Sequence, residues 1–150
     1  MNKLNNSNLV YRNLIRNEIR NYYSMAKLVE MDENETLKDQ MENEVAGPVI
    51  LINKFNMDSN EVEQFLKAWQ EDATKFKQQS GFISAQLHHG IGKSTVFVNY
   101  AVWESLKHFK NAVDKAMGPD MQSQLSKYPK SLVVSPHLFK KVAISGICSD

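Results

Sequence analysis

The sequence predicts an α+β domain in residues 47–150, with a ferredoxin-like βαββαβ order and an antiparallel sheet. Strand-like and helical patterns alternate from Gly47 onward, glycine-containing turns separate them, and the expected strands are apolar on both faces. Two helices cover only one face of such a sheet. The other face therefore calls for a second copy of the sheet, which would make a dimer with a closed or half-closed barrel. The alternative is a monomer whose N-terminal helix covers this face.

The first strand and helix follow from local patterns. Residues 49–55 (VILINKF) combine apolar residues on both faces with turn residues on either side. Asp58 and Glu61 have the spacing of a capping box, which predicts the start of a helix. Its apolar residues recur at helical spacing until Ser80-Gly81, where glycine favours the end of the helix.

The next three elements have equally clear boundaries. Residues 82–89 and 95–103 are expected strands, and a glycine-containing hairpin turn at 90–93 joins them. Ser105 then caps a second helix, whose apolar residues share one face.

The end of the expected domain is less regular. Gly118-Pro119 ends the second helix, and an irregular segment continues to Ser131. The last strand covers residues 132–144 and is interrupted by Pro136.

Residues 1–46 are interpreted as an N-terminal extension. Apolar residues recurring every four to five positions between 9 and 26 suggest a short amphipathic helix. The acidic stretch from Glu30 to Glu44 is expected to be a flexible tether or a charged helix. Met25 offers a second possible start of translation. We therefore state the hypothesis that the basic segment before Met25 is not part of the native protein.

Charge and composition exclude several classes of function. No arginine follows Arg20, so a highly anionic substrate or nucleic acid is not expected. The single Cys148 excludes an internal disulfide and fits a reducing compartment. No apolar run is long enough to span a membrane, and the first residues lack a secretory signal. We therefore expect a cytoplasmic protein, with an organelle transit peptide as the alternative.

Two motif-like segments do not fit a known site. Residues 90–95 (GIGKST) resemble the end of a phosphate-binding loop, but Leu87 stands where the first glycine is required, and the segment joins two strands. His88 and His89 are neighbours on a strand and point to opposite faces, so they do not chelate one ion. We expect no metal site and no cofactor.

One group of polar and aromatic residues remains. Alternation along the third strand places Phe97, Asn99 and Trp103 on one side and Tyr100 on the other. Asn53 is the single amide in the apolar first strand. His88 shares its expected face with Phe82, Ser84 and Gln86. The two amides, His88 and Trp103 are candidates for a pocket between the sheet and the helices, although each also has a structural explanation as a core or backbone-binding residue.

Residues 47–143 resemble the antibiotic biosynthesis monooxygenase family, a group of dimeric α+β barrels. The resemblance rests on PVILINKF at 48–55, on GFISA at 81–85 followed by His88, and on NYAVWES at 99–105. It implies that Asn99, Trp103 and His88 lie in or near a substrate site. A tyrosine of the family pocket falls on Phe109, and an arginine that follows the second helix in the family is missing here.

The resemblance implies a homodimer that oxidises a small aromatic or quinol-type substrate with dioxygen and without a cofactor. Asn99, Trp103 and His88 would be catalytic, and Asn53, Phe97 and Phe109 would bind substrate. A haem-cleaving relative of the same fold is not expected, because Ala112 stands at its tryptophan position and Gln122 near its histidine. The other possibility is a non-catalytic dimer that binds a small molecule or a partner.

Overall fold

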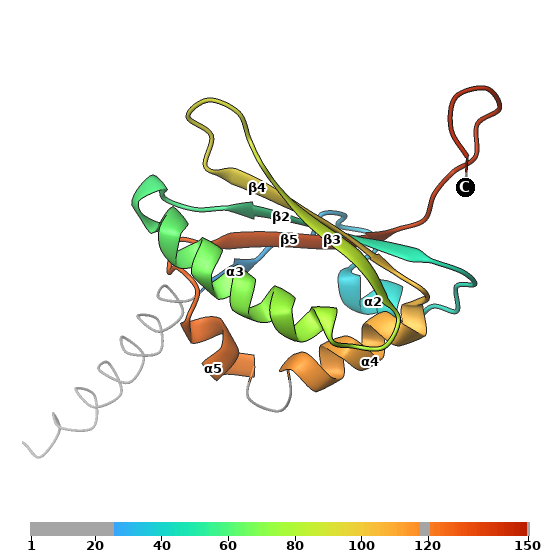
Figure 1. Cartoon of the computed structure of the whole chain (residues 1–150), viewed down its shortest axis with the longest axis horizontal. Helices are drawn as coiled ribbons and strands as arrows, with labels where there is room; N and C mark the ends of the chain where they lie inside the picture. Colours follow the sequence, from blue (N-terminus) through green and yellow to red (C-terminus); the bar gives the residue numbers. More distant parts are fainter. Residues whose placement is uncertain (1–25, 118–120, 150) are drawn as a thin grey trace, which may run out of the picture.

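The computed structural model describes residues 26–117 and 121–149. One five-stranded sheet has the order β1-β5-β2-β4-β3, and the helices lie along one side of it (Figure 1). This arrangement confirms the predicted α+β, ferredoxin-like fold. The elements are β1 (Lys27–Leu28), α2 (Leu37–Glu42), β2 (Val49–Asn56), the 3-10 helix η1 (Ser59–Glu61), α3 (Val62–Lys77), β3 (Phe82–His89), β4 (Val96–Trp103), α4 (Leu106–Met117), α5 (Met121–Ser126) and β5 (Val133–Phe139).

The four long strands pair only in antiparallel fashion. β2 pairs with β4 and β5, and β3 pairs with β4 at the edge. The two central strands, β2 and β4, therefore carry neighbours on both sides. Every second residue of β4 is buried beneath the helices, because successive side chains of a strand point to opposite faces.

The start of α3 differs from the predicted capping box. Asp58 makes no side-chain cap hydrogen bond, and a short 3-10 helix precedes α3. The carboxylate of Glu61 instead accepts hydrogen bonds from the backbone N–H and the hydroxyl of Ser131. The local pattern predicted that Glu61 caps the helix, but its carboxylate binds Ser131, which lies 70 positions away in the chain.

The segment before the last strand contains a helix that the sequence did not predict. α5 occupies part of the expected irregular stretch, and the residues after it bind α3. The hydroxyl of Tyr128 donates to an oxygen of Asp72 at 2.6 Å, and the ammonium of Lys127 pairs with the other oxygen. The predicted helix end at Gly118-Pro119 lies outside the described residues.

The last strand is shorter than predicted, and Pro136 does not interrupt it. β5 ends at Phe139, and a separate turn closed by an Ile144–Cys148 bridge follows. Pro136 pairs with Asn53 of β2 and has the same parity as Leu138, whose N–H and carbonyl face away from β2. The nitrogen of Pro136 therefore lies on that same side, and the pairing with β2 loses no hydrogen bond.

Part of the expected extension packs on the domain. β1 pairs in parallel with β5, and the acidic stretch forms the short helix α2. The side-chain amide of Gln40 donates to the carbonyl of Leu138 at 2.9 Å and accepts from its N–H at 2.8 Å. Gln40 thus bonds β5 much as a neighbouring strand would. The predicted amphipathic helix before residue 26 lies outside the described residues, and the domain boundary at residue 47 stays a prediction.

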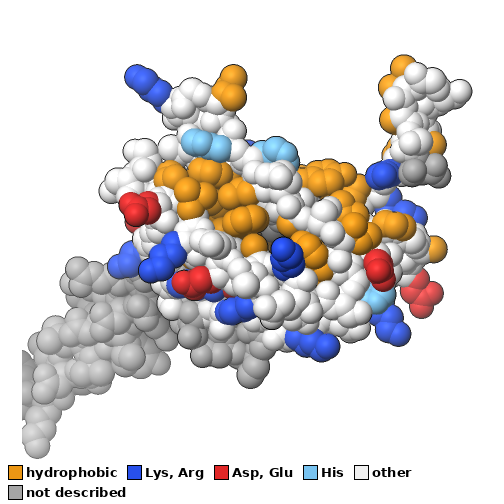
Figure 2. Space-filling view, viewed as in Figure 1, with side chains coloured by type: hydrophobic (Ala, Val, Ile, Leu, Met, Phe, Trp, Pro, Cys, Tyr) orange, Lys and Arg blue, Asp and Glu red, His pale blue; other side chains and the backbone are white. Residues whose placement is uncertain are grey.

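The face of the sheet opposite the helices carries a group of apolar residues, together with polar residues such as Lys54 and Gln86. Strand pairing places Tyr100 there, with 36% of its surface exposed, as alternation predicted. Hydrophobic side chains gather in a band over the strands in Figure 2. We call the residues Ile50, Ile52, Val96, Val98, Tyr100, Val102 and Phe139 the outer apolar face. In the described part of the chain, no helix is both long enough and apolar enough to cross a lipid bilayer.

Candidate active site

Two amides lie side by side on the helix-facing side of the sheet. Asn53 of β2 and Asn99 of β4 are direct cross-strand partners. Leu87 of β3 and Pro136 of β5 extend this row to both sides. Cross-strand partners point to the same face, so the row crosses the middle of the sheet beneath the helices. The pairing thus brings together both amides that the sequence predicted for the site.

A hydrophobic cluster lies on each side of this row. Phe55 and Phe97 belong to the cluster around Phe65 of α3. Ala101 and Trp103 belong to the other cluster, with Phe109 of α4. The amides therefore occupy a polar strip between two apolar regions, a position where each polar atom needs a partner.

Among the described residues on this face, two polar atoms have no hydrogen-bond partner. They are the side-chain oxygen of Asn99 and the indole nitrogen of Trp103, both shielded from solvent. Asn99 is 6% exposed and Trp103 is 2% exposed. An unpaired buried polar group costs about 1–3 kcal/mol. One acceptor and one donor, four residues apart on the same face of β4, are thus available to a ligand. A ligand that reaches them has to displace side chains that now cover them.

The indole of Trp103 is held by aromatic rings. Phe76, Phe82 and Phe109 meet it edge-on, with ring centroids 6.2, 5.4 and 5.8 Å away. Such edge-to-face contacts fix the orientation of an indole without using its N–H. Phe109 and Phe97, the two predicted substrate-binding aromatics, are 3% and 4% exposed and form walls on opposite sides of the amide row.

The structure does not bring His88 to this side of the sheet. His88 pairs with Val98, which lies on the outer apolar face, and its Nδ1 is 3.3 Å from the carbonyl of Val98. Phe82, expected on the same face as His88, lies against Trp103 instead. A β-bulge between Phe82 and Ser84 changes the alternation at this point. The expected convergence with Asn99 is therefore wrong for His88, and its catalytic role stays a prediction.

The histidine that shares the helix-facing side is His89. It pairs with Phe97, and the two rings stack with centroids 4.2 Å apart and an interplanar angle of 6°. The sequence carried a signal for this placement, since His89 alternates with Ala85 and Leu87 whereas His88 alternates with the polar Ser84 and Gln86. Strand parity thus selects the second histidine of the pair.

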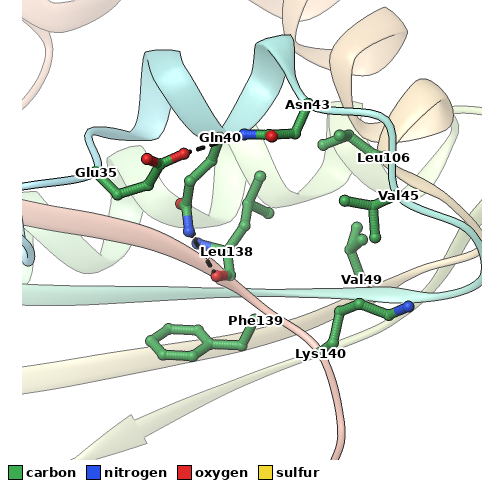
Figure 3. A pocket seen from close by; sticks show the side chains of 9 residues that line it. All are labelled: Glu35, Gln40, Asn43, Val45, Val49, Leu106, Leu138, Phe139 and Lys140. Carbon is green, nitrogen blue, oxygen red and sulfur yellow. Dashed lines mark hydrogen bonds between the residues drawn. The ribbon is translucent and has the colours of Figure 1, made fainter.

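A pocket lies outside this group of residues. It has a volume of ≈ 200 Å³ and opens between α2, the start of α4 and the ends of β2 and β5 (Figure 3). Gln40 and Asn43 reach toward it from the α2 side, but both amides already bind the protein. The lining residues are Glu35, Gln40, Asn43, Val45, Val49, Leu106, Leu138, Phe139 and Lys140. The site predicted from the sequence does not coincide with this pocket.

Other groups with potential chemistry have structural partners. Burial raises the pKa of Tyr128 far above its usual range, as does the hydrogen bond to Asp72, so this phenol stays protonated. Within the described residues, no group of three or more His, Cys, Asp or Glu side chains is arranged to hold a metal ion. A third buried, unpaired atom, Nδ1 of His137, belongs to a residue that pairs with Ile52 of the outer apolar face.

Comparison with protein families gives a match to the central part of the chain. Residues 48–117, from β2 through α4, match the family model described as antibiotic biosynthesis monooxygenase. This segment is similar to the antibiotic biosynthesis monooxygenase domain. The matched segment of this domain includes both amides, Trp103, Phe109 and the two histidines. A search of curated proteins gives no significant match.

Solved structures show the same fold. SnoaB, a cofactor-independent oxygenase from Streptomyces nogalater, is 22% identical with a TM-score of 0.56; the alignment covers 67% of this chain and 99% of SnoaB. A candidate monooxygenase from Shewanella loihica PV-4 is 26% identical with a TM-score of 0.53, over 67% of this chain and 100% of the other. Nearly the whole of each relative is thus represented in this chain, which has additional residues beyond the shared domain.

Proposed function

We propose that this domain is a cofactor-independent monooxygenase that oxidises a small phenolic or quinol-type substrate with dioxygen. The observation that carries the proposal is the pair of buried, unpaired atoms, the oxygen of Asn99 and the indole N–H of Trp103. Both lie in the matched family segment; Asn99 lies between the two hydrophobic clusters, and Trp103 belongs to one of them. The cofactor-independent activity of the structurally similar SnoaB supports the same reaction class.

The proposed reaction needs little from the protein beyond binding and electrostatics. A phenolic substrate loses a proton, and the resulting carbanion passes an electron to dioxygen. One oxygen atom becomes the new carbonyl oxygen of a quinone, and the other leaves as water with the hydrogen of the oxidised ring carbon and the proton that the hydroxyl lost. The N–H of Trp103 would stabilise the developing enolate oxygen, the amides of Asn53 and Asn99 would orient the substrate, and Phe97 and Phe109 would exclude water.

Oxygen uptake with a panel of quinols and anthrones, in the presence of a metal chelator, tests this function. We expect uptake by the wild-type chain and a loss of about 10²–10³-fold in kcat for Asn99→Ala and Trp103→Phe, because each removes one group that contacts the substrate. Asn60→Ala, an exposed change in η1, is the control. Full activity in both site variants would refute the site. Binding of quinols without uptake would instead assign a non-catalytic binding protein.

We propose that a second copy of the chain covers the outer apolar face. Tyr100 and Phe139 are each 36% exposed there, and β-sheets with two apolar faces are stable only when both are covered. The two sheets would then pack face to face, as the barrel interpretation requires. The proposal of a dimer rests on this argument and on the family resemblance.

Tyr100→Glu is expected to convert such a dimer into a monomer, since it buries an unpaired carboxylate between the sheets. Light scattering coupled to gel filtration measures the mass directly. Lys67→Glu on the exposed side of α3 is the matched charge change and should leave the mass unaltered. A wild-type chain that elutes as a monomer would favour the alternative, in which residues of the N-terminal extension cover the outer apolar face.

A further inference from the structure

The two neighbouring histidines of β3 occupy different environments. His89 pairs with Phe97 on the side of Asn99, whereas His88 pairs with Val98 on the outer apolar face. His89–Phe97 is two pairs further along the ladder than Leu87–Asn99, and it is the next pair on the same face. Diagonal neighbours on adjacent strands are about 7–8 Å apart, a distance that an imidazole and a bound ring bridge together. Only His89 of this pair is therefore placed beside the amide row.

The ring of His89 is fixed in orientation and in tautomer. Its Nε2 is 2.8 Å from the carbonyl oxygen of Ser94, and a carbonyl oxygen only accepts, so Nε2 carries the hydrogen. The neutral ring then has its lone pair on Nδ1. The stack on Phe97 holds the ring flat against a buried side chain. One nitrogen thus anchors the ring, and the other is left basic.

The hairpin turn supports this arrangement. Gly90 donates its N–H to the carbonyl of Val96 at 2.9 Å, and the hydroxyl of Ser94 accepts from the N–H of Val96 at 3.1 Å. A Cβ at Gly90 would lie 2.2 Å from the Ser94 oxygen, so the close approach requires glycine. The glycine-containing segment that resembles a phosphate-binding loop therefore serves to place the Ser94 carbonyl against His89.

We propose that His89, and not His88, accepts the proton of the substrate hydroxyl, an inference that rests on the proposed oxygenase function. The O–H bond of the phenolic substrate breaks, its electron pair stays on the substrate oxygen, and the proton moves to Nδ1 of His89. Because His89 is exposed at the end of its strand, the proton passes on to solvent. Dioxygen, as in the proposed function, is the oxidant in the step that follows.

Oxygen uptake by four variants, one of them a control, separates the two histidines. We expect His89→Ala to lower kcat by about 10²–10⁴-fold, as loss of a general base does, and added imidazole to restore much of the rate. His89→Phe keeps a ring against Phe97 but has no basic nitrogen, so it should be equally slow and should not respond to imidazole. His88→Ala tests the alternative that His88 is the base. Gln86→Ala is its control, because Gln86 lies on the same face as His88. A larger, imidazole-rescued loss in His88→Ala would overturn the proposal.

A second measurement is independent of oxygenation. 4-Nitrophenol, which changes absorbance on ionisation, reports proton transfer upon binding to the full chain at a pH where the free phenol is protonated. We expect the ionised spectrum with wild type and His88→Ala, and the neutral spectrum with His89→Ala. If these spectra are observed but no quinol is oxidised, His89 is retained as the proton acceptor and the oxygenase function is refuted. If quinol is oxidised and His89→Ala still gives the ionised spectrum, the oxygenase function is retained and the role of His89 as the proton acceptor is refuted.

Discussion

Replacing Asn99 with leucine is expected to stabilise the fold and to abolish oxygen uptake. The side-chain oxygen of Asn99 is buried and unpaired, and leucine has nearly the same shape without the polar atoms. The free energy of unfolding should rise by about 1–2 kcal/mol, since removal of an unsatisfied buried group recovers its desolvation cost. The melting temperature would rise by about 2–4 °C for each kcal/mol. Urea unfolding and calorimetry measure the two quantities.

Asn99→Ala provides the comparison for this prediction. Alanine also removes the amide, but it leaves a cavity, so its free energy of unfolding should be lower than that of the leucine variant. If both variants lose stability to the same degree, the amide is a structural hydrogen-bonding group and not a group reserved for a ligand. A gain in stability with a loss of activity is the trade-off typical of a binding site.

Phe65→Ala is expected to lower the free energy of unfolding by about 3–5 kcal/mol. Phe65 has no exposed surface, and its ring lies 4.9 Å from Phe55, 5.2 Å from Phe97 and 6.4 Å from Tyr128. Its loss removes a central contact between α3 and one half of the sheet. Urea unfolding monitored by circular dichroism gives the value. Leu66→Ala is the matched change, since Leu66 is 41% exposed on the same helix and should cost far less. Equal losses would contradict this assignment of the core.

The sequence predicted the strands well because period-two patterns specify them locally. β3 and β4 begin and end within one residue of their predicted bounds, and Asn99 and Trp103 share the predicted face. Alternation with the polar Ser84 and Gln86 also indicated the face of His88. Only Phe82 departs from that alternation, because a bulge between Phe82 and Ser84 moves it to the other side.

The remaining differences come from contacts between distant parts of the chain. α5 has six residues, too few for a periodic pattern, and the segment after it is bound to Asp72 of α3. Glu61 has the spacing of a capping residue but binds Ser131 instead. The two unpaired atoms of the site also give no signal in the sequence, because a missing hydrogen bond is a property of packing. Residue types alone identified Asn99 and Trp103; the structure adds the reason that they are available.

The side-chain amide of Gln40 has a consequence for aggregation. Strands at the border of a sheet expose N–H and carbonyl groups to which another chain can add. β1 pairs with part of the free side of β5, and the side chain of Gln40 forms hydrogen bonds with the backbone of Leu138 further along the same side. Among the described strands, β3 is therefore the long border that stays open, and it carries Ser84, Gln86 and His88 on its outer side. Loss of the Gln40 amide would expose the backbone of Leu138 in β5. This would create a second open strand edge to which another chain could add.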